Sequence, residues 1–162
     1  MTERTRTYSW TDPATVDAAV GGRSGLEVMR AIIAGELPAP PMAATLGFSI
    51  VEVEAGRAVF EVTPTEFHYN PIGVVHGGLA LTLLDSALGC AVHTTLAAGD
   101  RYTTLETKVN MTRALTDGVG VVRCEGNIVH VGGRTATAEG RVVDADGRLY
   151  AHGTSTCLIM RA

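Results

Sequence analysis

The chain has 162 residues, of which 46% are hydrophobic and 19% charged, and its formal net charge at pH 7 is −4. This composition is that of an ordinary globular protein, and the length predicts one domain with a substantial core. The lysines and arginines are scattered without a run, which argues against a nucleic-acid partner. No run of about 18 apolar residues occurs, so no membrane span is expected.

The chain contains three cysteines, Cys90, Cys124 and Cys157. Their number is odd and none forms a C-x-x-C pair, which argues against a disulfide framework and against a zinc site. Residues 1–30 contain no apolar stretch typical of a signal peptide. We therefore expect a reduced, cytoplasmic protein with no bound metal.

The N-terminal part of the chain predicts an arm followed by one short helix. Residues 1–23 are polar and rich in Thr, Asp and Gly, and we expect them to be loosely ordered. After Ser24, a candidate N-cap, apolar residues recur at helical spacing as far as Ile33. Gly35 and the prolines that follow are expected to end this helix.

Strand signals surround a second, longer helix. Segments 47–54 and 57–63 alternate around Ala55-Gly56, which is a hairpin signature. A glycine-rich turn then leads into an apolar helix that begins at Gly77-Gly78 and runs to about Leu96. A helix that is apolar around most of its circumference must be buried, which predicts a curved antiparallel sheet wrapped around it.

Four strands are expected after this helix. Their sequences are "TTLETKVNMT", "VGVVRCEGNIVHV", "RTATAEGRVVD" and "GRLYAHGTSTCLIM". Gly132-Gly133 and residues 144–147 are good hairpin turns, and tight connections predict an antiparallel meander of all four strands. Alternation in the first of these strands predicts one face made of Leu105, Thr107, Val109 and Met111.

One carboxylate, that of Asp85, interrupts the long apolar helix. At about 100° per residue, Asp85 shares a strip about 60° wide with Gly78, Thr82 and Gly89, while leucines occupy most of the remaining surface. This strip leaves room for a ligand or a second subunit to approach. The helical wheel alone leaves open whether Asp85 is catalytic or is paired structurally inside an interface.

The turn before the helix favours a catalytic role. Gly77 and Gly78 expose backbone N–H groups at the positive end of the helix dipole, where a developing oxyanion can be held. A carboxylate two turns further on, held away from water, is what acyl transfer to water requires. The amide of Asn70, six residues before His76, is placed to orient a water molecule or a carbonyl.

The segment "NPIGVVHGG", followed by six residues and an aspartate, resembles the hotdog-fold acyl-CoA thioesterases of the PaaI (phenylacetate-pathway) type. The resemblance continues in "LGFSIVEVEAGRAVFEV", "TTLETKVNMTRAL" and "VHVGGRTATAEGRVVDADGRLYAHGTSTC", and covers about residues 40–160. It implies an α+β hotdog fold over residues 40–162, with residues 1–39 as an N-terminal helical extension. It also implies hydrolysis of aryl- or medium-chain acyl-CoA by a homodimer or homotetramer, without a cofactor, since coenzyme A is part of the substrate.

The resemblance implies roles for individual residues. Asp85 matches the catalytic carboxylate, which acts as nucleophile or general base. Gly77 matches the position whose N–H polarises the thioester carbonyl, and His76 matches the histidine that supports this loop. Asn70 matches the asparagine that helps to place the water or the carbonyl.

The following strand supplies a Ser or Thr across the dimer in this family. Thr103 and Thr104 compete for that role here, and Thr104 is favoured. The candidate residues for substrate and coenzyme A contacts are Gly78, Thr82, Arg134 and Arg113, with Arg134 preferred over Arg113 as the phosphate contact.

Two other functions stay open at this point. An acyl-thioester dehydratase or hydratase on the same fold needs a histidine paired with an acid, but the "GHFP"-like loop of those enzymes is absent. A non-catalytic acyl-CoA binding module is disfavoured by the intact set of Asn70, His76, Gly77 and Asp85. His68, His130, His152 and Cys90 are expected to be structural, and His76 and His93 are too far apart on the helix to share a metal ion.

Overall fold

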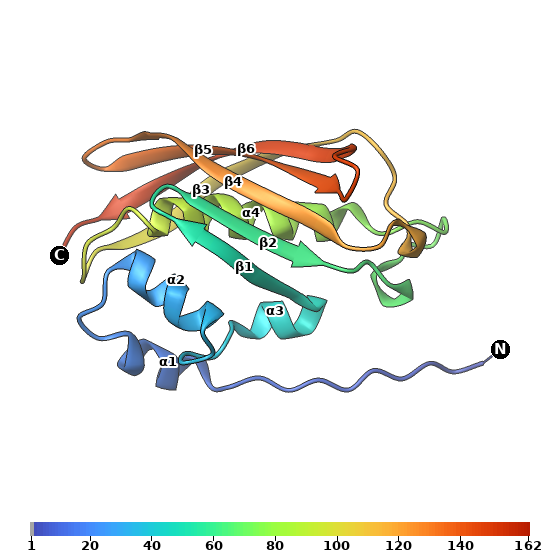
Figure 1. The fold of residues 1–162 in the computed structure, drawn as a ribbon, viewed down its shortest axis with the longest axis horizontal. Coiled ribbons are helices and arrows are strands. Elements are labelled where there is room, and N and C mark those ends of the chain that lie inside the picture. Colours follow the sequence, from blue (N-terminus) through green and yellow to red (C-terminus); the bar gives the residue numbers. More distant parts are fainter. Residues whose placement is uncertain (1) are drawn as a thin grey trace.

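The computed structural model describes residues 2–162 and shows one antiparallel sheet that curves around a long helix (Figure 1). The six strands are β1 (Phe48–Glu54), β2 (Arg57–Val62), β3 (Arg101–Met111), β4 (Val122–Val131), β5 (Thr135–Asp144) and β6 (Leu149–Met160). The long helix, α4, covers Gly77–His93, and two 3-10 helices, η1 and η2, cover Glu66–His68 and Asp117–Val119. The expected α+β hotdog fold is confirmed.

The strand order in the sheet is β1-β2-β4-β5-β6-β3. Strands β4, β5 and β6 form a meander, but the expectation that β3 continues this meander beside β4 is wrong. Strand β3 pairs with β6 at the edge of the sheet, while β4 pairs with β2. The segment between β3 and β4, residues 112–121, contains η2 and is long enough to carry the chain past two strands.

The core lies between α4 and the concave face of the sheet. Leu83, Leu84 and Leu88 of α4 are fully buried there, as the apolar circumference of the helix predicts. The helix ends at His93, before the expected Leu96. The N–H groups of Thr95 and Leu96 bond to carbonyls three residues back, and the Thr94 and Thr95 hydroxyls also donate to carbonyls of the last turn.

Helix α4 packs closely against β4 at Gly126. A Cβ atom on Gly126 would lie 2.5 Å from the carbonyl oxygen of Ala87, a backbone atom of α4 that cannot move away alone. Only a residue without a side chain therefore lets the helix sit this close to the sheet.

We expect the Gly126→Ala variant to lose about 1–3 kcal/mol of unfolding free energy, the usual cost of overpacking a core. The matched control is Gly133→Ala in the β4–β5 turn, where no atom lies within 4 Å of the added methyl group. Thermal or urea unfolding of both variants measures the difference. Equal stability of the two variants would contradict the close approach at Gly126.

Three helices precede the sheet in the chain: α1 (Pro13–Val20), α2 (Gly25–Ile33) and α3 (Pro41–Leu46). Helix α2 begins as expected at Ser24, whose side chain forms a capping box with Glu27. Its buried side chains include Val28 and Met29, whereas its last residue, Ile33, is 40% exposed. The division of the chain at residue 40 stays a prediction, because α3 continues the helical segment up to β1.

The other two helices were not expected. Residues 1–23 are not a loosely ordered arm throughout, because Asp12 caps α1 and Pro13 occupies its first turn. The prolines near residue 40 were expected only to end α2, but Pro41 also begins α3. Both helices use the preference of proline for the first helical position, where its missing N–H costs nothing.

Residues 2–12 run in an extended path along α3 and η1 (Figure 1). The Arg6 guanidinium donates hydrogen bonds to the carbonyls of Ala44, at 2.8 Å, and Thr45, in the last turn of α3. The same guanidinium lies 4.0 Å from the ring centre of Phe67. Arg6 therefore caps the carboxyl end of α3 and joins it to η1.

His68 joins α3 to the turn before α4. Its Nδ1 accepts a hydrogen bond from the Thr65 N–H at 3.0 Å, so Nε2 carries the proton and donates to the Leu46 carbonyl at 2.7 Å. The His68 carbonyl accepts from the His76 N–H. Burial lowers the pKa of His68, although its hydrogen bond to Leu46 opposes this effect. As expected, His68 is a structural histidine.

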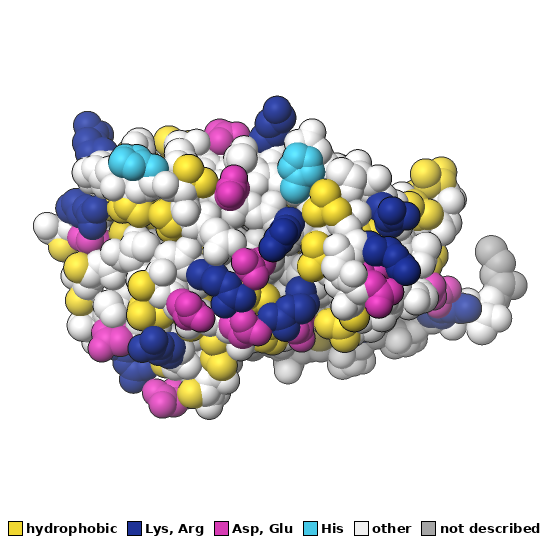
Figure 2. All heavy atoms as spheres, turned by 45° about the horizontal axis from the view of Figure 1, so that its top comes forward, with side chains coloured by type: hydrophobic (Ala, Val, Ile, Leu, Met, Phe, Trp, Pro, Cys, Tyr) yellow, Lys and Arg dark blue, Asp and Glu magenta, His cyan; other side chains and the backbone are white. Residues whose placement is uncertain are grey.

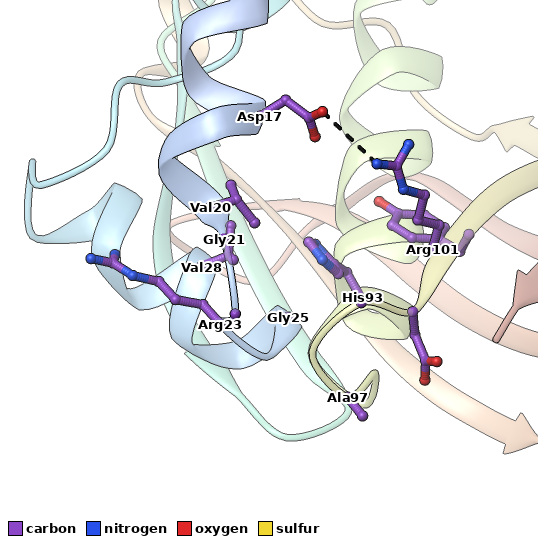
Figure 3. Close-up of a pocket in the computed structure, with 13 residues that line it drawn as sticks. Asp17, Val20, Gly21, Arg23, Gly25, Val28, His93, Ala97 and Arg101 are labelled. Carbon is purple, nitrogen blue, oxygen red and sulfur yellow. Dashed lines mark ion pairs between the residues drawn. The ribbon is translucent and has the colours of Figure 1, made fainter. Parts of the chain in front are cut away.

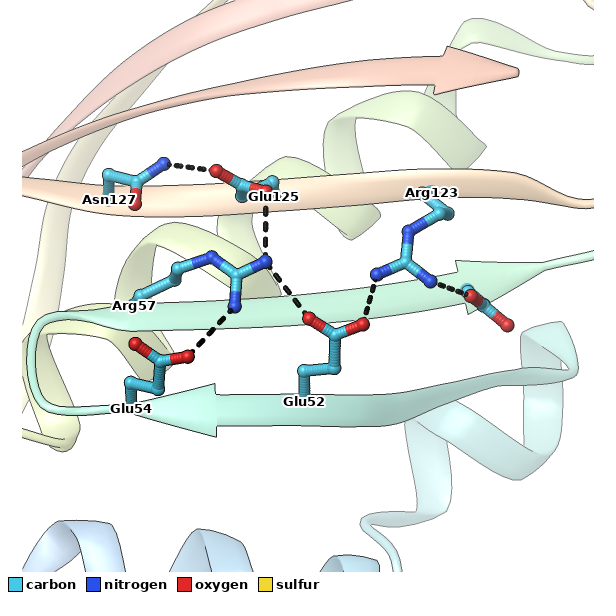
Figure 4. A network of polar contacts seen from close by, with 7 residues as sticks. Glu52, Glu54, Arg57, Arg123, Glu125 and Asn127 are labelled. Carbon is cyan, nitrogen blue, oxygen red and sulfur yellow. Dashed lines mark hydrogen bonds and ion pairs between the residues drawn. The ribbon is translucent and has the colours of Figure 1, made fainter. Parts of the chain in front are cut away.

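Ion pairs join three strands on the convex face of the sheet (Figure 4). Arg57 of β2 contacts Glu52 of β1 at 2.9 Å and Glu125 of β4 at 3.1 Å, and Arg123 contacts Glu52 and Glu61. The hydrogen bond from Arg123 is the main cause of the lowered pKa of Glu52. Because these carboxylates are matched by arginines, we interpret the cluster as structural.

The face shown in Figure 2 has basic and acidic side chains intermixed over the sheet. This face does not show the one-sided basic surface that nucleic-acid binding uses, and the absence of a nucleic-acid partner stays a prediction. Among residues 2–162, no helix has the length and apolarity that crossing a membrane requires.

Candidate active site

The amino-terminal turn of α4 is organised by His76. Its Nδ1 accepts a hydrogen bond from the Gly78 N–H at 2.8 Å, which makes His76 the N-cap of the helix. Because Nδ1 is the acceptor, the neutral ring carries its proton on Nε2 and presents a donor there. The Gly78 N–H is thus already bonded, whereas Gly77, at the first helical position, has no acceptor within the helix. Of the two glycines, Gly77 offers the N–H for an oxyanion.

Asn70 holds the loop that precedes this turn. Its Oδ1 accepts hydrogen bonds from the N–H groups of Ile72 at 3.0 Å and Val74 at 3.4 Å. The loop then closes by a backbone pair between Tyr69 and Val75. The side-chain oxygen of Asn70 is therefore engaged by the backbone, and only its NH2 group is left for a carbonyl or a water molecule.

The expectation that Asp85 is held away from water is wrong for the single chain. Asp85 is exposed, and Leu81, one turn earlier on the same side of α4, is 41% exposed. The concave sheet covers only one side of α4, and the strip of small and polar residues is open at Asp85, whereas Gly89, one turn further on, is buried against Tyr102. This geometry leaves Asp85 accessible to a ligand or to another protein surface.

The sheet residue that contacts Asp85 is Thr107 of β3, which the sequence did not single out for the site. Its hydroxyl donates a hydrogen bond to Asp85 Oδ1 at 3.1 Å. Thr104 lines the same cavity as Asp85, while Thr103 is exposed on the opposite face of β3. The placement thus agrees with Thr104 rather than Thr103, and adds Thr107 as a direct partner of the carboxylate.

A bulge explains why strand alternation missed this arrangement. The pairing between β3 and β6 shifts register between Thr104 and Glu106. Thr104 and Thr107 consequently both face α4, and Leu105 is 58% exposed. The expectation that Leu105 shares a face with Thr107 is therefore wrong.

One chain does not bring Gly77 and Asp85 to the same reacting carbonyl. Eight residues of helix place their Cα atoms about 12 Å apart along the axis. A carbonyl that accepts from an N–H at about 2.9 Å cannot also contact a carboxylate at that separation. Within a single chain, therefore, the Gly77 N–H and the Asp85 carboxylate cannot act on one thioester carbonyl.

Beside Gly77 lies a cavity of about 360 Å³, lined by His76, Met111 and Arg113 among others. Arg113 is thus close to the helix terminus, whereas Arg134 is not. The Arg134 carbonyl bonds to the Ile159 N–H, and Ile159 pairs with Tyr102, nine residues before Met111 on β3. Nine strand residues span about 30 Å, so within one chain Arg134 lies at the other end of the sheet.

The remaining contact candidates and thiols also have defined places. The Thr82 hydroxyl donates to the Gly78 carbonyl at 2.9 Å, within the turn that follows Gly77. Burial raises the pKa of Cys90 to about 12, so its thiol stays protonated at neutral pH, which agrees with a structural role. Cys90, Cys124 and Cys157 are free cysteines.

A separate cavity of about 420 Å³ lies between α1, α2 and the carboxyl end of α4 (Figure 3). His93 lines it, and Arg101 lies 3.8 Å from Asp17 at its edge. It contains none of the expected site residues. Within residues 2–162, no three His, Cys, Asp or Glu side chains are grouped as metal ligands would be. The absence of a metal or cofactor stays a prediction.

The curved sheet, the polar amino terminus of α4 and the carboxylate two turns along it define a hotdog-fold protein with the parts of a hydrolytic site. Comparison with known proteins identifies the class more closely. Residues 72–151 match the family model of the thioesterase superfamily. The chain is 31% identical over 116 residues to a Saccharolobus solfataricus protein that is provisionally named as an esterase. The match covers 72% of this chain and 81% of that protein.

Two further similarities agree with this match. The 1,4-dihydroxy-2-naphthoyl-CoA hydrolase of Listeria monocytogenes is 26% identical over 117 residues, which are 72% of this chain and 94% of that protein. The crystal structure of a phenylacetic acid degradation-related protein from Ralstonia eutropha superposes with a TM-score of 0.72 at 30% identity, covering 80% of this chain and 98% of that one. The chain belongs to the thioesterase superfamily. The resemblance to PaaI-type thioesterases is confirmed, and the protein is a thioester hydrolase.

Proposed function

We propose that the protein hydrolyses acyl-CoA thioesters to a free acid and coenzyme A. The observation that carries this proposal is the combination, on one helix, of an open N–H at Gly77 and an accessible carboxylate at Asp85. The coenzyme A ester named for the Listeria relative supports the substrate class. Neutral aryl or medium-chain acyl groups are the proposed range.

In the general-base route, Asp85 takes a proton from water while the water oxygen attacks the thioester carbon. The carbonyl electron pair moves onto oxygen, which accepts a hydrogen bond from the Gly77 N–H. Collapse of the intermediate breaks the C–S bond, and coenzyme A leaves with a proton. In the nucleophilic route, Asp85 attacks the carbon itself, the C–S bond breaks and coenzyme A leaves as its thiolate, which takes a proton from water. A second water molecule then hydrolyses the mixed anhydride to the free acid and the Asp85 carboxylate. His76 holds the turn, while Asn70 and Thr104 orient the water or the carbonyl.

A second copy of the chain completes the site in this proposal, because Gly77 and Asp85 of one chain are too far apart for one carbonyl. Strand β3 is the open edge next to α4, with unpaired backbone groups along its free side. Large apolar side chains are exposed on these two elements: Leu81 is 41%, Leu105 58% and Met111 53% exposed. Antiparallel pairing of two β3 edges would cover them and set Gly77 of one copy near Asp85 of the other.

Other proposed properties follow from the same assignment. Within one chain, Arg113 is nearer than Arg134 to Gly77 and is the better candidate for contacting a phosphate of coenzyme A. Arg134 of a second copy stays a candidate for the same contact. A homodimer is the minimum assembly, and a homotetramer is the proposed one. The free cysteines support a reducing, cytoplasmic location.

The test is release of coenzyme A thiol from a panel of acetyl, hexanoyl, decanoyl, benzoyl and phenylacetyl esters. We expect turnover of at least one ester, because the proposed base and oxyanion donor are both present. Binding without thiol release across the panel would favour the acyl-CoA binding module. Hydration of an enoyl-CoA without thiol release would favour the dehydratase or hydratase.

A further inference from the structure

A cavity of about 410 Å³ opens beside Asp85 and extends along α4 to Gly89 and Cys90. Its other walls come from strands β1, β2 and β3 and from helices α2 and α3, which lie beside the β1 edge of the sheet in Figure 1. The wall formed by α2 and α3 belongs to residues 25–46, outside the region that matches the family model.

Most of the side chains that line this cavity are apolar. Ile32 and Ile33 contribute from α2, Met42 from α3, and Phe48 and Ile50 from β1. Within the described part of the chain, no Lys, Arg or His lines this space. A second carboxylate on a bound acyl group would have no cationic partner here, and burying an unpaired charge is costly.

The polar atoms at the inner end of the cavity stay neutral. Tyr102 and Cys90 both line this end, and burial raises the pKa of Tyr102 well above its ordinary value. Thr104 and Ser86 add hydroxyl groups near Asp85. Such a space binds an uncharged group and offers few hydrogen bonds to direct it.

The outer rim consists of large apolar side chains that are still in contact with water. Ile33 is 40% and Met42 54% exposed, although both face the cavity. A ligand that extends from Asp85 past Cys90 would cover these two side chains and gain from the water it displaces.

The wall is held in place from two sides. Val28 and Met29 of α2 are buried and pack near Ile50 and Cys90. Arg6 bonds to the last carbonyls of α3, so the extended N-terminal residues fix the segment that carries Met42. The rim is therefore a positioned surface rather than a loose flap.

We propose that α2 and α3 form the selecting wall of the acyl-binding space, restricting this thioesterase to uncharged, apolar acyl groups whose length Ile33 and Met42 limit. This inference rests on the proposed function, since the acyl group is taken to enter with its carbonyl at Asp85. The occupant is the aliphatic chain of the thioester, because flexible and branched aliphatic side chains, rather than a flat aromatic slot, form the rim.

The first experiment uses Ile33→Trp in the full-length protein. A larger side chain at the rim shortens the space, so the ratio of kcat/KM for decanoyl-CoA to that for propionyl-CoA should fall by at least about 10-fold, the effect of one or two methylenes in a pocket. Arg30→Trp adds the same bulk on the exposed outer side of α2 and is the matched control. A ratio that changes equally in both variants, or in neither, overturns the proposal.

The second experiment tests the charge of the space with Met42→Lys. The native protein should hydrolyse butyryl-CoA at least about 100-fold better than succinyl-CoA, and a lysine at the rim should raise the succinyl share at least about 10-fold. An unchanged share overturns the proposal but leaves the proposed function standing, because butyryl-CoA is still hydrolysed. Absence of thiol release from every ester overturns the proposed function and, with it, this inference.

Discussion

Replacement of Asp85 by asparagine is expected to lower kcat by roughly 10²–10⁴-fold, the range for removal of an acid–base group. The fold should be unaffected, because Asp85 is exposed and an asparagine oxygen can still accept the hydrogen bond from Thr107. The measurement is single-turnover and steady-state thiol release from the best ester of the panel. Glu54→Gln, an equivalent change at an exposed position on β1, is the matched control.

The Asp85→Glu variant separates placement from charge. It keeps the carboxylate but moves its oxygens by about 1 Å, and such a displacement can cost about 10²-fold. We expect it to recover little of the lost rate. Near-normal turnover by folded Asp85→Asn protein would remove Asp85 from the chemistry, whatever the glutamate variant does.

The sequence predicted those parts of the molecule that depend on local signals. The apolar circumference of α4, the turn glycines and the Ser24 cap each act within a few residues, and the structure has the corresponding elements. Helix α1 carries an equally local signal, Asp12 followed by Pro13, but the polar composition around it obscured the cap. These features are set by backbone hydrogen bonding near each helix end.

Non-local features were not predicted. The position of β3 beside β6 depends on which strands are already paired, which no single segment encodes. The bulge after Thr104 reverses the side on which Leu105 lies, and it brings Thr107 to Asp85. Alternation assumes an unbroken strand and cannot reveal such a shift.

The exposure of Asp85 has a different origin. The helical wheel separated a small, polar strip from the leucines correctly, but it did not say what covers that strip. In one chain nothing among residues 2–162 buries Asp85 or Leu81. If two copies share the site, the surroundings of Asp85 and Leu81 are completed by the surface of the second copy, which the sequence of one helix cannot reveal.

This argument leads to a prediction for Gly77→Pro. Proline has no N–H, so this substitution removes the donor at residue 77. The first helical position otherwise accommodates proline well. His76 has φ −61° and ψ 132°, a conformation that a following proline favours. We expect a folded protein whose kcat is lower by roughly 10²–10³-fold, as for loss of one oxyanion donor. The Gly77→Ala variant is the control, because its Cβ also contacts the flexible end of the Met111 side chain but its N–H is retained. The difference in kcat between the two variants measures the contribution of the N–H donor.

Mixed assemblies of Gly77→Pro and Asp85→Asn chains then test whether one site draws on two copies. Each variant alone should be nearly inactive, since every site lacks either its donor or its carboxylate. In a mixed dimer, one site combines the intact Gly77 of one chain with the intact Asp85 of the other. Random pairing makes half of the dimers mixed, so co-refolded chains should regain about one quarter of the native activity. Activity no higher than the mean of the two variants would place Gly77 and Asp85 of the same chain in each site, against the separation of about 12 Å along α4.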